Sequence, residues 1–207
     1  MNYIDMPVSE FTAALASSSP APGGGGASAL AAALGAALAC MVGNLTVGKK
    51  KYAENEPRLR ELIAEAQSLR ERLLALVDAD AEAFLPLAAA YRLPKDAPGR
   101  DAVMEKCLAD AAAVPMEILE LSCRVIALQE EFAALGSSLA VSDAGTGAVF
   151  AWAAMYGAAL NVLVNTRLMA DCERAADMNR RVNELMQEYR VKAGRVYGDI
   201  FAKLSDK

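Results

Sequence analysis

The 207-residue chain contains no histidine. This excludes serine or cysteine nucleophiles activated by histidine, and it excludes most zinc and iron sites, which use imidazole ligands. Any acid–base chemistry must rely on carboxylate, lysine, tyrosine or cysteine side chains. The four cysteines (Cys40, Cys107, Cys123 and Cys172) stand singly and form no Cys-x-x-Cys pair. We therefore expect buried free thiols in a reducing cytoplasm and no metal site.

Aromatic residues are also scarce, at 6% of the chain. β-Branched residues are comparatively few, whereas roughly a fifth of the chain is alanine, the strongest helix former. This composition disfavours a sheet protein. The formal net charge of −5 argues against a nucleic-acid surface, which needs clustered cations. The N-terminus lacks the basic start and apolar core of a secretory signal, so we expect a cytoplasmic protein.

Two long stretches, residues 11–48 and 144–166, carry no charge. Each is long enough to resemble a membrane span, but the first is mostly alanine and glycine, which contribute little to membrane insertion. We expect no membrane association and predict two helices that are apolar on all sides and buried. The other helices are too few to cover both completely, so a second subunit is expected to cover the remainder, as a homodimer.

The remaining sequence shows helical periodicity. Pro57 fits the first turn of a long helix, and residues 93–99 form a loop rich in proline and glycine. A further helix is predicted from about Asp101 to Gly136. Ser142 and Asp143 are predicted to cap the start of the second apolar helix, and a last helix is predicted to begin near Asp171. Residues 1–207 are thus predicted to form one all-α domain, an up-and-down bundle.

The apolar seam of the long helix alternates steps of three and four residues and consists of Leu59, Leu62, Ala66, Leu69, Leu73 and Leu76. Its continuation past Leu76 lands on Asp80. A carboxylate therefore stands where an apolar side chain is expected, one turn before Phe84. Burial is costly for a carboxylate and raises its pKa toward the range useful in proton transfer. Asp80 is either an acid–base group or a structural carboxylate that bonds a helix end or an arginine; spacing leaves both open.

Amide side chains interrupt both apolar helices. Asn161 and Asn165 lie one turn apart on the same face of the second, and Asn44 lies in the first. Buried amides need partners, so they either bridge helices or present donors and acceptors to a ligand. Asp143 shares this ambiguity, because a capping role would explain it fully.

Four consecutive glycines, residues 23–26, directly precede the first apolar helix. Glycines at a helix start can expose backbone N–H groups to an anion or a polar ring, although a flexible turn is equally compatible. The pattern of a nucleotide-binding P-loop is missing. Lys49, Lys50 and Lys51 follow the same helix, either as a solvated end or as a site for an anionic tail.

Seven segments taken together resemble the cyclodeaminase/cyclohydrolase family, which includes the C-terminal domain of formiminotransferase-cyclodeaminase and free-standing methenyltetrahydrofolate cyclohydrolases. They are residues 19–25 (SPAPGGG), 44–52 (NLTVGKKKY), 78–84 (DADAEAF), 91–95 (YRLPK), 114–115 (VP), 142–145 (SDAG) and 157–162 (GAALNV). The segments follow one another in order over most of the chain, so the resemblance is specific.

This resemblance implies a helical, homodimeric enzyme that acts on tetrahydrofolate one-carbon units without a metal or redox cofactor. Asp80 matches the family's catalytic aspartate. The positions that resemble the lining of the folate pocket are Pro22, Gly23, Gly24, Gly25, Asn44, Lys49, Asp143, Asn161 and Asn165. Residues 136–141 depart from the family, in which asparagines are usual there, and Thr166 replaces a common leucine. Both departures concern substrate contacts.

Two activities fit the resemblance. A cyclohydrolase adds water to 5,10-methenyltetrahydrofolate to give 10-formyltetrahydrofolate, and a cyclodeaminase releases ammonia from 5-formiminotetrahydrofolate to give 5,10-methenyltetrahydrofolate. Asp80 would transfer protons in either reaction. We expect the cyclohydrolase, because no formiminotransferase domain accompanies the helical one. A non-catalytic scaffold, in which Asp80 and the asparagines only fix helix register, is the alternative from another class.

Overall fold

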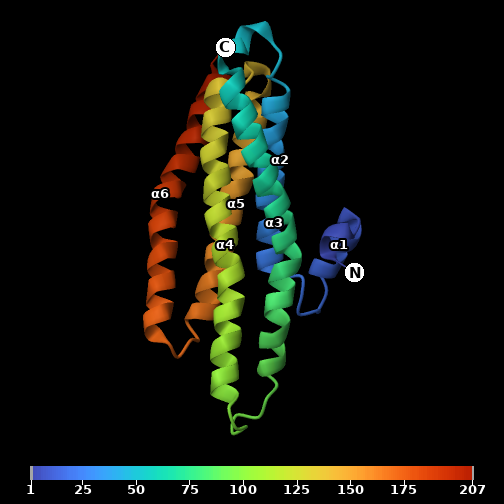
Figure 1. The fold of residues 1–207 in the computed structure, drawn as a ribbon, viewed down its shortest axis with the longest axis vertical. Helices are drawn as coiled ribbons and strands as arrows, with labels where there is room; N and C mark the ends of the chain where they lie inside the picture. The colour runs from blue at the N-terminus through green and yellow to red at the C-terminus, as the bar shows by residue number, and fades with distance from the viewer. Residues whose placement is uncertain (1, 207) are drawn as a thin grey trace.

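The computed structural model describes residues 2–206, and over that range it contains helices and no strand. The α-helices are α1 (Val8–Leu15), α2 (Gly24–Asn44), α3 (Glu56–Ala90), α4 (Arg100–Leu135), α5 (Val141–Thr166) and α6 (Cys172–Ser205). Three short 3-10 helices accompany them: η1 (Tyr3–Asp5), η2 (Lys50–Asn55) and η3 (Ser138–Ala140). Helices α2 to α6 run alternately up and down the long axis (Figure 1). The all-α prediction is confirmed.

Several helix ends follow the predicted local signals. Pro57 lies in the first turn of α3, and the Asp171 side chain caps α6 by accepting the Arg174 N–H at 3.0 Å. The predicted cap of α5 is wrong: the helix begins at Val141, with Ala140 at the N-cap, and Asp143 lies inside the first turn. The reason is that η3 runs directly into α5 and brings the chain into helical geometry before Ser142.

The core confirms the apolar seam predicted for α3. Six seam residues are buried: Leu59, Leu62, Ala66, Leu69, Leu73 and Leu76. They pack with buried residues of α2, α4, α5 and α6 in one hydrophobic core. Helix α5 contacts α2, α4 and α6. The backbones of α5 and α2 approach each other closely. A methyl group added to Gly35 of α2 would lie only 2.9 Å from the carbonyl oxygen of Gly147 in α5.

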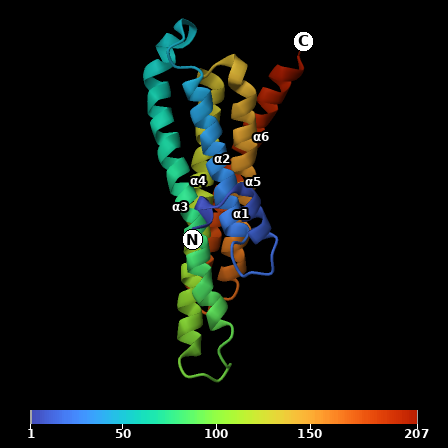
Figure 2. The same ribbon diagram turned by 90° about the vertical axis from the view of Figure 1, so that its right-hand side faces the viewer.

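The two apolar helices are only partly covered in the single chain. Side chains along α2 and α5 reach solvent, with Leu34 49% and Leu160 68% exposed. Figure 2 shows these two helices side by side at one face of the bundle. Both are long and apolar enough to cross a membrane by length and composition alone, and 61% and 44% of their most apolar windows are buried within the chain. Burial on all sides is therefore not confirmed.

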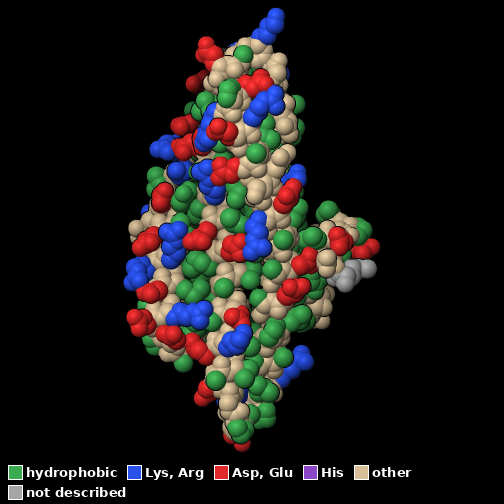
Figure 3. All heavy atoms as spheres, in the orientation of Figure 1, with side chains coloured by type: hydrophobic (Ala, Val, Ile, Leu, Met, Phe, Trp, Pro, Cys, Tyr) green, Lys and Arg blue, Asp and Glu red, His purple; other side chains and the backbone are tan. Residues whose placement is uncertain are grey.

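Helices α3, α4 and α6 present a different surface. Figure 3 shows Lys, Arg, Asp and Glu side chains interspersed over the face that these helices form. Ion pairs join neighbouring helices across it: Arg72 of α3 with Glu117 of α4 at 2.6 Å, and Arg181 of α6 with Glu120 of α4 at 3.0 Å. The amphipathic helices thus turn their charges to water, whereas α2 and α5 present apolar side chains.

The four cysteines are free, as predicted, but one of them is not buried. Cys40, Cys107 and Cys123 lie in the interior, whereas Cys172 is exposed at the first residue of α6. The expectation of burial is wrong for Cys172, because the start of α6 lies at the end of the bundle where the chain turns.

Candidate active site

The N-terminus of α2 is capped from another helix. Gly23 occupies the N-cap and has no side chain to accept the free backbone N–H groups of the first turn. The Asp80 carboxylate of α3 takes this place, since its Oδ2 accepts the Gly26 N–H at 2.9 Å. The positive end of the α2 dipole therefore faces a carboxylate. Asp80 does bond a helix end, one of the two roles that the sequence left open.

The glycines make room for this contact. A methyl group on Gly25 would lie 2.0 Å from Asp80 Oδ1, and one on Gly24 would lie 3.1 Å from Asn161 Nδ2. Real Cβ atoms essentially never approach a neighbour within 3.0 Å. Asp80 can therefore occupy its present position only because residue 25 is glycine. The glycine run therefore serves close approach of side chains from α3 and α5, in addition to forming the start of α2.

The surroundings of Asp80 make its carboxylate hold a proton more strongly than an exposed aspartate does, because they raise its pKa. Burial is the largest influence and raises the pKa of Asp80 above its ordinary value, and the hydrogen bond from the Gly26 N–H opposes this to a smaller extent. Among the described residues 2–206, Asp80 alone is ionisable in the lining of the cavity into which it opens. Asp80 thus combines burial with access to a cavity, as expected of a group that exchanges protons.

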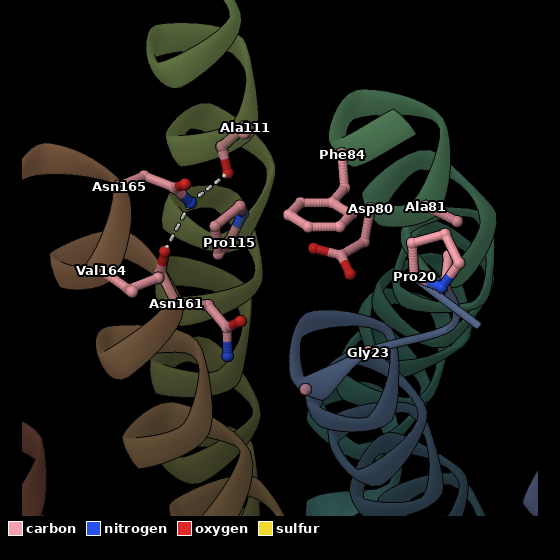
Figure 4. A pocket seen from close by; sticks show the side chains of 12 residues that line it. Pro20, Gly23, Asp80, Ala81, Phe84, Ala111, Pro115, Asn161, Val164 and Asn165 are labelled. Atoms are coloured by element: carbon pink, nitrogen blue, oxygen red, sulfur yellow. Dashed lines mark hydrogen bonds between the residues drawn. The ribbon is translucent and has the colours of Figure 1, made fainter. Parts of the chain in front are cut away.

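That cavity, of about 200 Å³, lies where α2 begins, between α3, α4 and α5. Figure 4 shows the Phe84 ring beside the Asp80 carboxylate, with the Asn161 amide on the opposite wall. Pro115 of α4 and Val164 of α5 contribute apolar surface, and Pro20 closes another side. The cavity therefore offers one carboxylate and two amides, those of Asn161 and Asn165, within mainly apolar walls. This arrangement suits a flat, largely apolar ring with a few polar atoms.

The two asparagines of α5 have different roles. Asn165 Nδ2 donates to the Ala111 carbonyl at 3.0 Å and to the Asn161 carbonyl at 2.9 Å. Pro115 cannot donate to Ala111 along α4, because proline has no N–H, and Asn165 supplies the missing donor. Asn161 bonds its own helix at Gly157 with Nδ2, at 2.8 Å, and borders the cavity. Thus Asn165 bridges α5 to α4, whereas Asn161 is placed to meet a ligand.

The structure brings together only part of the predicted set. Gly23, Gly24, Asp80, Asn161 and Asn165 line the cavity. Pro22 is buried in the preceding turn, and Gly25 lies against Asp80. Asn44, Lys49 and Asp143 lie at the opposite end, since α2 alone is about 30 Å long at 1.5 Å per residue. Their role in binding stays a prediction.

Several lining residues were not predicted from the sequence. They are Pro20, Ala21, Ala81, Phe84, Ala111, Pro115 and Val164. Phe84 could have been found, because it lies one turn after Asp80 on the same helix face. Pro115 and Ala111 carried no such signal, since α4 meets this cavity only through the tertiary fold. Within residues 2–206 there is no group of three or more cysteine, aspartate or glutamate residues that could hold a metal ion.

Comparison with known proteins agrees with this arrangement. The sequence model of the formiminotransferase-cyclodeaminase family matches residues 7–184. The chain belongs to this family. It is 37% identical to methenyltetrahydrofolate cyclohydrolase from Methylorubrum extorquens, over 96% of this chain and 97% of that protein. It is 33% identical to formimidoyltransferase-cyclodeaminase from Rattus norvegicus, over 97% of this chain but only 38% of that longer protein.

A solved structure of the family has the same fold. Formiminotetrahydrofolate cyclodeaminase from Thermotoga maritima superposes with a TM-score of 0.81 and 26% sequence identity, over 95% of this chain and 94% of that one. Both kinds of relative are named as enzymes, so the chain is a member of an enzyme family.

Proposed function

We propose that the chain is a methenyltetrahydrofolate cyclohydrolase in which Asp80 is the acid–base group. The observation that carries this proposal is a buried carboxylate that opens into a mainly apolar cavity at the start of α2. The M. extorquens cyclohydrolase is similar over nearly its whole length, which supports hydration of the methenyl group as the reaction.

The proposed substrate carries a positive charge on the amidinium group that joins N5 and N10. An ionised Asp80 would attract this charge within apolar walls, where electrostatic interactions are stronger than in water. The Phe84 ring beside the carboxylate offers a flat surface against which the pterin ring can stack. Asn161 on the opposite wall can donate to or accept from the polar edge of that ring.

Hydration then needs three proton transfers, two of which involve Asp80. Asp80 removes a proton from water as the oxygen attacks the amidinium carbon, which gives a neutral carbinolamine and a protonated Asp80. The carbon–N5 bond then breaks, N5 takes the proton from Asp80, and the carbinolamine hydroxyl loses its proton to become the formyl oxygen. The products are 10-formyltetrahydrofolate and one proton. A raised pKa suits Asp80 to both steps, since the same group must accept a proton and return it.

Formimidoyltetrahydrofolate cyclodeaminase activity is the second candidate, because the T. maritima relative with the same fold carries that name. In this reaction N10 attacks the formimino carbon and its proton passes to the formimino nitrogen. Asp80 then gives that nitrogen a second proton, and its bond to carbon breaks to release ammonia and the methenyl cation. Both reactions pass through a tetrahedral carbon between N5 and N10, so the same cavity can accommodate either. Neither reaction as proposed calls for a metal or redox cofactor.

Separate assays with the two substrates distinguish these activities. The purified chain is mixed with 5,10-methenyltetrahydrofolate or with 5-formiminotetrahydrofolate, and absorbance of the methenyl group is followed against buffer alone. We expect the absorbance to fall faster with the first substrate than in buffer. A rise with the second substrate and no acceleration with the first would replace the proposal with cyclodeaminase activity.

We also propose that the chain forms a homodimer through the exposed apolar face of α2 and α5. Eight side chains of this face are exposed: Leu34, Met41, Leu45, Phe150, Tyr156, Leu160, Leu163 and Val164. Together they expose on the order of 700 Å², close to the ~800 Å² that each partner buries in a standard interface. Sedimentation should show a dimer for the wild type and a monomer for Leu160→Asp, whereas Val191→Asp on α6 should stay dimeric.

A further inference from the structure

We propose that residues 7–22 form a lid over the Asp80 cavity, and that the Phe11 side chain is the latch that holds this lid closed. The segment, called the strap, contains α1 and the loop that follows it, and it lies between η1 and the N-cap of α2. The ligand that the lid admits is the folate substrate, so this inference rests on the proposed function.

The Asp80 cavity is small for the proposed ligand. Its volume is about 200 Å³, whereas pockets for ligands of drug size usually measure roughly 300–1,000 Å³. At least one wall must therefore move before a folate can enter. Most of the walls are the start of α2 and the sides of α3, α4 and α5, which are packed in the hydrophobic core. The remaining wall consists of Pro20 and Ala21 of the strap.

The wall formed by the strap is the one held least firmly. Across residues 2–206, the hydrogen bonds of residues 17–22 stay within residues 14–19, and none of them reaches α3, α4 or α5. Burial of Ala21 and Pro22 is what keeps this wall in place. The strap can therefore move away from the cavity without breaking a hydrogen bond to the helices that form the other walls.

Helix α1 is attached to the bundle through a single side chain. Figure 1 shows α1 standing off at the side of the bundle, and its backbone makes little contact with any of the long helices. Phe11 is its only buried residue, whereas Val8 is 77% exposed. A helix of eight residues is marginal in water on its own, so α1 depends on the Phe11 contact. Phe11 therefore decides whether the strap is attached or released.

Packing around this latch is incomplete. A second cavity, of about 110 Å³, lies where the N-terminal segment meets α2 and α3. It is lined by Tyr3, Ile4, Met6, Val8 and Phe11 of the N-terminal segment and by Leu30, Leu74 and Val77 of the bundle. Side chains that border a void lack part of the dispersion contacts of a filled core. Release of Phe11 therefore loses less contact than release of a fully packed phenylalanine, as a latch that opens repeatedly requires.

Both ends of the strap are fixed near one turn of α3. Before the strap, η1 packs on α3, and the Tyr3 N–H donates to Asp78 Oδ1 at 2.5 Å. After it, the Gly26 N–H donates to Asp80 Oδ2 at 2.9 Å. A segment that is fixed at both ends and loose between them can open and return to the same position, as lids do. Asp78→Asn keeps an acceptor for the Tyr3 N–H, so the first fixed end survives that substitution.

Hydrogen–deuterium exchange tests the lid without a measurement of turnover. Once released, α1 unwinds, so its amides exchange whenever the strap opens. The Asp80→Asn protein is labelled with and without saturating methenyltetrahydrofolate, and peptides from α1 and α6 are compared by mass spectrometry. We expect the ligand to slow exchange in α1 by about fivefold or more and to leave α6 unchanged, although no residue of α1 lines the Asp80 cavity. Equal exchange in α1 with and without ligand would overturn the proposal.

Phe11→Ala tests the latch through its kinetics. Loss of the latch favours the open strap, so KM for methenyltetrahydrofolate should rise by about tenfold. The value of kcat should stay within about twofold of the wild type, because α3 and the Gly26 N–H, and not the strap, hold Asp80 in place. Phe201→Ala removes the same side chain from an exposed site on α6 and should leave both constants unchanged. A folded Phe11→Ala protein with wild-type KM would overturn the proposal.

These measurements also separate the lid from the function on which it rests. Wild-type turnover, combined with exchange in α1 that does not respond to the ligand, refutes the lid and leaves the proposed function intact. A wild-type protein that accelerates neither folate reaction refutes the proposed function, and the inference with it.

Discussion

Gly25→Ala should lower turnover by roughly 100-fold or more without unfolding the protein. The added methyl group would lie 2.0 Å from Asp80 Oδ1, 2.5 Å from its Cγ and 2.6 Å from its Oδ2. Ordinary van der Waals contact begins at 3.4 Å, so Oδ1 must retreat by about 1.4 Å. The carboxylate would then lose its 2.9 Å hydrogen bond from the Gly26 N–H, because both oxygens belong to the same rigid group.

The magnitude follows from this displacement. Misplacement of a catalytic group by about 1 Å can lower a rate by roughly 100-fold, so kcat should fall by at least that factor. The helix should tolerate the change, because the higher helix propensity of alanine, by about 1 kcal/mol, offsets the loss of one cap hydrogen bond of about the same size. The expected combination is therefore low activity with little change in thermal stability.

The assay compares kcat on methenyltetrahydrofolate and the thermal midpoint for Gly25→Ala with those of a control variant. Gly194→Ala on α6 is a suitable control, because a methyl group there meets nothing within 4 Å. Gly25→Ala combined with Asp80→Asn should lose little more activity than Asp80→Asn alone, since both act through one carboxylate. Wild-type kcat in Gly25→Ala would refute the argument.

Three further predictions concern pH, a helix bridge and thiol accessibility. Burial raises the pKa of Asp80, so the stability of the folded chain should be greatest below the pKa of the unfolded chain and should decrease as pH rises through the raised value. Urea unfolding over a pH series should show this decrease in the wild type and not in Asp80→Asn, while kcat of the wild type rises over the same range. Asn165→Leu removes the donor to the Ala111 carbonyl and should lower the free energy of unfolding by about 1–3 kcal/mol, measured by urea titration; an unchanged value would contradict the bridging role. A thiol reagent should modify only Cys172 in the folded chain, and rapid modification of a second cysteine would show that the interior is open.

Local periodicity explains why much of the fold was predictable. The seam of α3 was readable because a helix repeats its core positions every three or four residues, and all six predicted positions are buried. The same rule located Asp80, since it identified a position on a buried face without knowledge of the neighbouring helices. The start of α3 at Pro57, the loop at residues 93–99 and the Asp171 cap of α6 followed from proline, glycine and aspartate, whose backbone preferences are local. The Ser142-Asp143 cap did not, because η3 runs directly into α5.

The remaining features depend on tertiary contacts. Nothing in residues 111–115 indicates that Pro115 frees the Ala111 carbonyl for an amide of α5, because that contact joins segments 54 residues apart. The composition of α2 and α5 indicates apolar helices but not which side remains uncovered, since that depends on how their neighbours pack. Asn44, Lys49 and Asp143 resemble pocket residues in sequence, yet helix length places them far from Asp80 in the single chain.

The central claim, that the Asp80 carboxylate transfers protons to and from a folate substrate, is tested most directly by kcat of Asp80→Asn on methenyltetrahydrofolate. Asparagine retains an oxygen that can accept the Gly26 N–H, so the cap of α2 is kept while the titrating group is lost. Asp78→Asn is the control, because Asp78 lies two residues away and accepts the Tyr3 N–H at 2.5 Å outside the cavity. We predict that Asp80→Asn stays folded with kcat lowered by roughly 100-fold or more, and that Asp78→Asn keeps wild-type kcat. A folded Asp80→Asn protein with wild-type kcat would contradict the account.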